Sequence, residues 1–589
     1  MSTNLRRGSV LVLVLVMALA FVPVQRAAAT NADVVLVSTL RQQEEPVTAY
    51  LTYNAQISTF DPQRAEDVFS ITVAEQLFLG LTDSDPENPG SVKPELATEW
   101  TVDETGTVWT FTLRDDVPWV KWDSATQTAT EVRKVTAGDV AYGIKRACDP
   151  RLGAYYGTIA AQVVAGCNDL ISQAVEDTTD EDYSLVQAEA LDDTTLQITL
   201  QYPAGFFFSM TPMWMLRPVP QELIAEVGDD WIEPANIIIN GPYVVDEYVR
   251  GVRLVFLKNP LLPDDLRGPG NLDRILVTTV EDQGTRFALY QDNQIDTGPV
   301  PSAEFQAVIN DPEYTDELVQ GSDLGVGYFG FAFDKAPFDN VHARRAFAAS
   351  LDREAFIQQV IQGRGLPMIH LTPPGMFGAP PINEIGVGYN PDYARAQLAE
   401  AGYPDCEGLP ELSMVVDSGG VGGDAAEFLA ASMERELGCD PNQITIEQQE
   451  FSVRLQTVKA TNATEDRPNI WMALWGPDYP DANNWVGSVL SCEFSDNDFK
   501  RPCTEVDDLI DQAARETDPE LRMELYSQIE EQFFGEEGEM PMIPIYMRLT
   551  FTLYKPWYTG PFETDGLFGA PHYDWRSVDA ALQAEARGE

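Results

Sequence analysis

The stretch PELATEWTVDETGTVWTFTLR, residues 94–114, contains a clear strand pattern. Within it, Val108–Leu113 alternates β-branched or polar residues with large apolar ones, which predicts a strand with one face in water. Thr195–Leu200 has the same alternation. Two more uniformly apolar runs, Arg253–Leu257 and Ile275–Val280, predict more deeply buried strands. Sheets are therefore a main part of the expected fold.

Helical patterns alternate with these strands. Ala343, Phe347 and Leu351 follow one another at intervals of four, which places them on one face of a helix. Asp352 can cap the next helix. Two further stretches also have helical patterns, Gln448–Val458 and Pro519–Phe534. No period of roughly 20–50 residues recurs, so the chain is predicted to be a mixed α/β protein of several domains and not a solenoid or propeller.

The composition excludes several classes of protein. The chain has 589 residues, enough for about three to four domains of ~150 residues each. Its 44% hydrophobic and 10% aromatic content excludes a long disordered polymer. The 93 acidic and 38 basic residues give a net charge of −55. Nucleic-acid backbones and anionic membranes attract positive surfaces, so we expect binding to neither. The acid excess is expected to serve solubility, in a salty environment for example.

The first thirty residues have the pattern of an export signal. Arg6 and Arg7 are followed by a mostly apolar run, Val10–Val22, and by the small residues Ala27–Ala29. The apolar run is shorter than the roughly 20 residues that span a bilayer, and no cysteine near the cut could carry a lipid. We expect residues 1–29 to be removed near Ala29, leaving a soluble protein in the periplasm or outside the cell envelope. Retention of the segment as an anchor is the alternative.

The cysteines predict structural cross-links. Six cysteines, an even number in a chain with an export signal, indicate disulfides. Pairing of nearest neighbours needs only short loops, and among the fifteen possible connectivities we expect this one: Cys148–Cys167, Cys406–Cys439 and Cys492–Cys503. No CxxC motif is present, so neither a thioredoxin-like site nor a zinc ribbon is predicted.

Motifs for catalysis and for metal binding are weak. The three histidines, His342, His370 and His572, lie in no nucleophile-elbow context, and both GxSxG and HExxH are absent. The run Asp83–Glu87 resembles the start of a calcium loop, but it lacks the required glycine and the final glutamate, and we interpret it as a polar turn. We therefore expect no catalytic residue, no metal and no cofactor. A secreted glycoside hydrolase stays an alternative, because 93 acids make chance carboxylate pairs plentiful.

Residues 471–485, WMALWGPDYPDANNW, concentrate side chains typical of binding sites. Gly476, Pro477 and Pro480 predict a loop here. Its rings could stack on a ligand while a carboxylate pairs with a cationic end, or the loop could be purely structural. The side chains concerned are Trp471, Trp475, Tyr479, Trp485, Asp478 and Asp481.

A series of short motifs, in order along most of the mature chain, resembles the large extracytoplasmic solute-binding proteins of ABC importers. This is family 5, the group of oligopeptide-, dipeptide- and nickel-binding proteins. Each motif is weak alone, but their order and spacing are specific. The matching pieces are Ser58–Pro62, Gly80–Thr82, Pro94–Trp100, Trp109–Arg114, Thr136–Val140, Gly241–Tyr243, Lys258–Pro260, Arg345–Arg353, Asn390–Tyr403, Trp475–Pro480 and Lys555–Gly560. Residues 236–240 depart from the usual approach to Gly241–Tyr243.

The resemblance implies a periplasmic-binding-protein type II-like α/β fold. It has two lobes and three domains, with a discontinuous first domain and a ligand cleft at the hinge. The segments expected are domain I at 30–72, 190–280 and 545–589, an inserted domain II at 73–189, and domain III, the second lobe, at 281–544.

The resemblance also implies a function, the capture of oligopeptides for an importer. In peptide-binding members an aspartate of the tryptophan-containing loop pairs with the α-ammonium group, and Asp478 is the matching position. Trp475 and Tyr479 would line the pocket, and the remaining candidates for ligand contact are Trp471, Trp485 and Phe60. The residue that would bind the ligand carboxylate is not identified.

The expected partners are a peptide or other small solute and the membrane permease with its ATPase, and the protein is expected to be a monomer. An oligosaccharide ligand is the alternative within the family, because tryptophan-rich clefts suit sugars. A nickel ligand is less favoured, because the chain has only three histidines.

Overall fold

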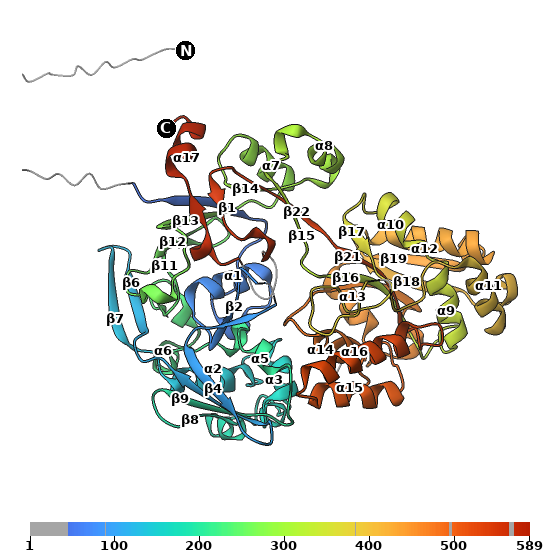
Figure 1. Ribbon diagram of the computed structural model, residues 1–589, viewed down its shortest axis with the longest axis horizontal. Coiled ribbons are helices and arrows are strands. Elements are labelled where there is room, and N and C mark those ends of the chain that lie inside the picture. Colours follow the sequence, from blue (N-terminus) through green and yellow to red (C-terminus); the bar gives the residue numbers. More distant parts are fainter. Residues whose placement is uncertain (1–44, 89, 383, 494–496, 565–570) are drawn as a thin grey trace, which may run out of the picture. The chain divides into compact units, whose positions relative to one another are not determined.

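The computed structural model describes residues 45–88, 90–382, 384–493, 497–564 and 571–589. The expected export signal, residues 1–29, lies outside this part of the chain. The residues from Pro46 to Glu589 form one unit, which Figure 1 shows as a mixture of sheets and helices. No helix of the described part is long and apolar enough to cross a membrane.

One sheet joins the start of the described chain to residues beyond 240. Its strands, in order, are β1 (Thr48–Tyr53), β13 (Arg274–Thr279), β12 (Arg253–Lys258) and β11 (Tyr243–Val249). β1 is parallel to β13, and the other neighbours are antiparallel. Leu254 and Phe256 of β12 and Ile275 and Val277 of β13 are buried, which confirms the two predicted buried strands. Helix α1 (Val68–Leu77) follows β1 and is capped by the Asp67 side chain.

A second sheet contains the two predicted alternating strands. Its order is β4 (Ala97–Val102), β5 (Val108–Leu113), β9 (Thr195–Thr199) and β8 (Ala188–Ala190). Between β5 and β9 lie α2 (Ala137–Ala147), α3 (Gly157–Val163) and α4 (Cys167–Ile171). A disulfide joins Cys148, at the end of α2, to Cys167 at the start of α4. A cross-link over a loop of this length contributes about 3 kcal/mol by constraining the unfolded chain.

A six-stranded sheet dominates the second half of the chain (Figure 1). Its order is β17 (Gly365–Pro367), β21 (Met542–Arg548), β16 (Val326–Phe331), β20 (Ile470–Trp475), β18 (Leu412–Asp417) and β19 (Ile444–Gln449). β18 is parallel to both β19 and β20. The C-terminal ends of these three strands therefore lie at one edge of the sheet, and the loop after Trp475 starts there. In open α/β sheets this edge is the usual place for a ligand.

The helices of this half largely follow the prediction. α9 (Val341–Ser350), α10 (Arg353–Gln359), which Asp352 caps, and α16 (Pro519–Phe534) are confirmed. The prediction of one helix over Gln448–Val458 is wrong at its start. Residues up to Gln449 belong to β19, where they pair with β18, and α13 begins only at Phe451. Pairing with a neighbouring strand overrides the local helical pattern there.

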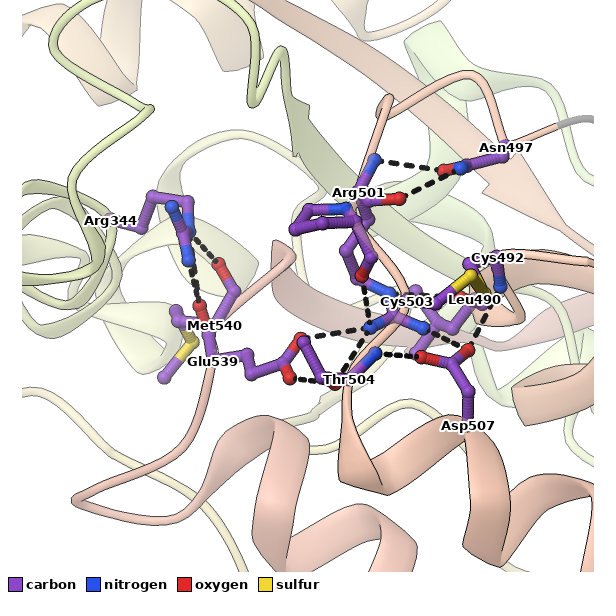
Figure 2. A network of polar contacts seen from close by, with 11 residues as sticks. Arg344, Leu490, Cys492, Asn497, Arg501, Cys503, Thr504, Asp507, Glu539 and Met540 are labelled. Atoms are coloured by element: carbon purple, nitrogen blue, oxygen red, sulfur yellow. Dashed lines mark hydrogen bonds and ion pairs between the residues drawn. A yellow bond between two sulfur atoms is a disulfide. The ribbon is translucent and has the colours of Figure 1, made fainter.

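All six cysteines are joined in the three nearest-neighbour pairs, Cys148–Cys167, Cys406–Cys439 and Cys492–Cys503. The last pair holds the loop that carries Arg501 (Figure 2). The Arg501 guanidinium is fully buried and lies between Asp507, at the start of α15 (Glu505–Arg515), and Glu539, whose Oε2 is 3.1 Å away. The buried cation thus connects the cross-linked loop to two other segments.

The buried apolar residues form two large clusters. The N-terminal core gathers residues between 49 and 277 and between 554 and 578, together with Tyr479 and Ala514. The C-terminal core gathers residues between 324 and 547. A small sheet, β14 (Thr297–Pro299), β22 (Thr550–Tyr554) and β15 (Leu318–Gly321), accompanies a third cluster. The chain runs from β15 into β16 and returns from β21 into β22. The expected domain boundaries stay a prediction, because one core includes the segments expected to be domains I and II.

Candidate functional site

The loop between β20 and the short helix α14 (Asn483–Trp485) lies between the two cores. Trp475, at its start, packs against the C-terminal core, whereas Tyr479 is buried within the N-terminal core. Asp478 is next to Tyr479 and is half-buried. The sequence predicted a loop for the whole of 471–485, which is wrong at both ends. Trp471 and Trp475 lie on β20, and Trp485 ends α14.

Asp478 is held by polar groups that carry no charge. Its backbone N–H donates to Asn484 Oδ1 at 2.8 Å, and Asn484 Nδ2 donates to Asp478 Oδ2 at 3.0 Å. The Tyr156 hydroxyl, at the start of α3, also interacts with this carboxylate. Burial raises the pKa of Asp478 to about 6, and the hydrogen bonds from Asn484 and Tyr156 oppose this shift. Among the described residues, no arginine, lysine or histidine forms an ion pair with Asp478.

Asp481, three residues further on, shows the contrasting case. It is almost fully buried, but its Oδ2 lies 3.1 Å from Arg522 Nη1 and its Oδ1 accepts the Tyr526 hydroxyl at 2.8 Å. The same Oδ1 accepts the backbone N–H of Asn483 at 3.0 Å. Asp481 is therefore satisfied within the protein and supports the loop, whereas Asp478 has no counter-charge in the part of the chain that the structure describes.

Trp475 is the other predicted residue with an accessible ring. Its side chain is half-buried, and the indole N–H donates to the Asn484 carbonyl at 3.1 Å. This bond fixes the orientation of the ring while part of its surface stays open to a ligand. Trp475 and Asp478 are thus brought together through Asn484.

The remaining predicted residues are packed in the cores. Tyr479 stacks on Phe206 and donates its hydroxyl to Asn483 Oδ1 at 2.9 Å. The others are Trp471, which contacts Phe499, Trp485, which is fully buried, and Phe60, which packs against Tyr248. Packing accounts for these four rings, so a proposal of direct ligand contact rests on Trp475 and Asp478.

The structure adds Tyr156 and Trp214 from the N-terminal half. Tyr156 interacts with Asp478, and its ring meets that of Trp214 edge-on at 4.8 Å. Neither residue was a candidate from the sequence, because nothing in the local pattern links a tyrosine near α3 with a loop that follows β20. Only the packing of the two halves reveals the contact.

The described residues contain one group of side chains close enough together for metal binding, Cys492, Glu493 and Cys503. Its two sulfurs are joined in a disulfide and are not available as thiolate ligands. Asp83, which begins the expected polar turn, pairs with Lys93 at 3.1 Å across the hairpin of β2 (Thr82–Ser84) and β3 (Val92–Pro94).

Comparison with known proteins decides the family. The family model described as bacterial extracellular solute-binding proteins, family 5 (middle part), matches residues 91–497. The chain belongs to this family. The family 5 assignment confirms the resemblance found in the motifs.

Relatives of the family 5 protein span nearly its whole length. The chain is 28% identical over 516 residues to the probable deoxycholate-binding periplasmic protein YgiS of Escherichia coli K12, covering 86% of this chain and 88% of YgiS. It is 27% identical over 552 residues to the periplasmic oligopeptide-binding protein OppA of Salmonella typhimurium LT2, with 92% and 94% covered. The crystal structure of Haemophilus influenzae OppA in complex with RPPGFSPFR superposes with a TM-score of 0.69 at 25% identity, covering 91% of this chain and 99% of that one. The fold is thus the mixed α/β, type II periplasmic-binding-protein fold.

Proposed function

We propose that this solute-binding protein captures peptides that have a free amino terminus, and that Asp478 binds their α-ammonium group. The observation that carries the proposal is the setting of Asp478: a half-buried carboxylate between two cores, oriented by two hydrogen bonds with Asn484, with no cationic partner among the described residues. A ligand ammonium would supply the missing charge.

The energetics favour discrimination as well as affinity. A buried charge that lacks a partner is costly, whereas a charge-assisted hydrogen bond is roughly twice as strong as a neutral one. The Asp478 site would therefore reject a ligand whose amine is blocked, because the carboxylate would stay unpaired. The partly open ring of Trp475 would contact the apolar part of the ligand.

The negative charge of Asp478 also favours one of the ligand classes in the relatives' names over the others. OppA of Salmonella typhimurium is named for oligopeptides, and that of Haemophilus influenzae was crystallised with a peptide. YgiS is named for deoxycholate, which is an anion. An anion near Asp478 would be repelled, and a neutral oligosaccharide would leave the carboxylate unpaired. A peptide ammonium fits this site best.

The proposal includes export and transport. We propose that the chain is exported, is cleaved near Ala29 and acts outside the cytoplasm as the soluble component of an ABC importer. The two chain crossings between the small sheet and the six-stranded sheet would serve as a hinge. Ligand would favour the closed form through its higher affinity for that form, and the closed form would dock on the permease and its ATPase.

Calorimetry with trialanine and N-acetyl-trialanine tests the role of Asp478. We expect the wild type to bind the free-amino peptide more tightly, and Asp478→Ala to lose most of that preference. Asp169→Asn, which removes an exposed charge on α4, is the control for net charge and should bind like the wild type. Equal losses for both peptides in Asp478→Ala would contradict the proposed role.

A carrier should also leave its ligand unchanged. We therefore expect mass spectrometry to recover intact peptide after prolonged incubation with the protein. Cleavage of the peptide, or of a polysaccharide in a parallel incubation, would instead support the hydrolase alternative.

A further inference from the structure

Asn484 makes three hydrogen bonds within the candidate site and is fully buried. Its Oδ1 accepts the Asp478 backbone N–H at 2.8 Å, and its Nδ2 donates to Asp478 Oδ2 at 3.0 Å. Its own carbonyl accepts the Trp475 indole N–H at 3.1 Å. One residue therefore holds the carboxylate and the ring together.

The orientation of the Asn484 amide follows from these partners. The Asp478 backbone N–H can only donate, so the atom that faces it must be the amide oxygen. The NH₂ group then faces the carboxylate, where it donates to the ionised form. Burial disfavours the ionised form of Asp478, and the hydrogen bond from the Asn484 NH₂ group stabilises that form. Because this donor is neutral, the negative charge of Asp478 stays available to a ligand.

The loop has other supports that do not touch Asp478. Asp481 pairs with Arg522 and accepts the Tyr526 hydroxyl, and Tyr479 packs on Phe206. Loss of the Asn484 side chain should therefore change the carboxylate more than the course of the loop.

We propose that Asn484 is the positioning residue of this site and that it sets the pH range in which Asp478 binds a cation. The inference rests on the proposed ammonium-binding role of Asp478. It adds a regulatory feature, because the same amide that orients the carboxylate also decides how readily a proton competes with the ligand.

The groups that face Asp478 do not themselves titrate near neutral pH. Tyr156, from the start of α3, interacts with the carboxylate, and Tyr479 is its neighbour in the loop. Tyr155 and Glu66 lie beyond Tyr156 and act on that tyrosine. Both tyrosines stay neutral because burial raises their pKa, so Asp478 is the group expected to titrate near neutral pH.

A titration of the ligand-free full chain tests this inference without any peptide. Aspartates are labelled with ¹³C at the carboxyl carbon, and the Asp478 signal is identified by its absence in Asp478→Asn. The wild-type midpoint should lie at about pH 6. In Asn484→Ala it should rise by about one pH unit, because the lost bond favoured the ionised form. Asn484→Asp keeps the shape of the side chain but replaces the amide donor with a second carboxylate, so the pair should titrate in two steps, one of them above the wild-type midpoint.

Tyr526→Phe is the matched control, since it removes a loop hydrogen bond that does not involve Asp478. Its midpoint should equal that of the wild type. The inference is overturned if Asn484→Ala and Asn484→Asp titrate like the wild type, or if Tyr526→Phe shifts as far as they do. Should the alanine variant fail to fold, the aspartate variant decides the question.

Binding of trialanine supplies the second readout. At pH 6.5 the affinity of Asn484→Ala should be about threefold lower than that of the wild type, because a smaller fraction of its Asp478 is ionised, and the difference should nearly vanish at pH 8, where both carboxylates are ionised. An equal loss at both pH values would show that Asn484 is merely structural. If Asp478→Ala does not affect peptide binding but the NMR midpoints move as expected, the ammonium role fails and the positioning role stands.

Discussion

Phe206 and Tyr479 stack with ring centroids 5.7 Å apart and planes 13° from parallel. Phe206 precedes α5 (Phe207–Met210) in the N-terminal half, whereas Tyr479 lies beside Asp478 in the loop that leaves the six-stranded sheet. This contact fixes the loop to the N-terminal core, whereas Trp475 packs against the C-terminal core. The position of the candidate carboxylate therefore depends on both cores.

The first prediction concerns this stack. Phe206→Leu keeps most of the buried volume but loses the ring–ring term of about 0.5–1.5 kcal/mol. We expect a melting temperature lower by about 1–2 °C and weaker binding of free-amino peptides, because the Asp478 loop is less fixed. Phe207→Leu is the control, since Phe207 is equally buried but contacts Trp109. Equal effects of both variants on peptide affinity would show that the stack has no role in the site.

The second prediction concerns the cost of keeping Asp478 ionised. Its pKa rises from 3.8 to about 6 on folding, so stability is highest while the group is protonated and falls as the pH rises through about 6. At pH 7.5 this costs the ligand-free protein up to about 3 kcal/mol. Asp478→Asn should therefore unfold at a higher temperature than the wild type at pH 7.5, but not at pH 4. Identical melting curves for the two proteins at pH 7.5 would mean that the carboxylate is well solvated.

Local patterns in the sequence predicted several elements correctly. Val108–Leu113 and Pro519–Phe534 form the expected strand and helix with these same bounds, because alternation and helical spacing report which face is buried. Gln448 and Gln449 were misplaced, since polar residues at a sheet edge do not show which neighbour they pair with.

The candidate site was only partly predictable. The motif around Trp475 identified Asp478, but it could not separate a ligand-facing ring from a packed one. Tyr479 is buried because Phe206 covers it, and Tyr156 reaches Asp478 from the other half of the chain. Both contacts join segments far apart in the sequence, so they cannot be predicted from the spacing of residues within either segment. The sequence likewise could not show that Asp478 has no cationic partner among the described residues, because this depends on which side chains surround it in the fold.

The third prediction follows from the net charge of −55. Repulsion among so many like charges opposes the folded state, and salt weakens it by shortening the screening length from about 10 Å at 0.1 M to about 3 Å at 1 M. We expect the melting temperature to rise steadily over this range of NaCl and of KCl. Sucrose of matched osmolality is the control for general solvent effects. A flat or falling response to both salts would indicate that ion pairs and bound counterions already neutralise the surface.

The last prediction concerns a buried charged cluster in the N-terminal core. Glu95 follows β3 and accepts the Gly80 backbone N–H, and it lines a small enclosed cavity with Asp83 and Arg217. Burial and the charge of Asp83 raise its pKa well above the ordinary value. The stability that Glu95 contributes is therefore complete below its unfolded pKa of about 4.3 and is lost as the pH rises toward the folded value.

Glu95→Gln should remove this pH dependence while keeping an acceptor for Gly80. In urea unfolding, we expect the variant to be more stable than the wild type at pH 8, by about 1.4 kcal/mol for each pH unit of the shift, and similar to it at pH 4, below the unfolded pKa. Glu99→Gln, an exposed glutamate on β4, is the control and should change neither value. If Glu95→Gln were less stable than the wild type at pH 8, the carboxylate would have to be ionised and stabilised there by Arg217 and Lys93.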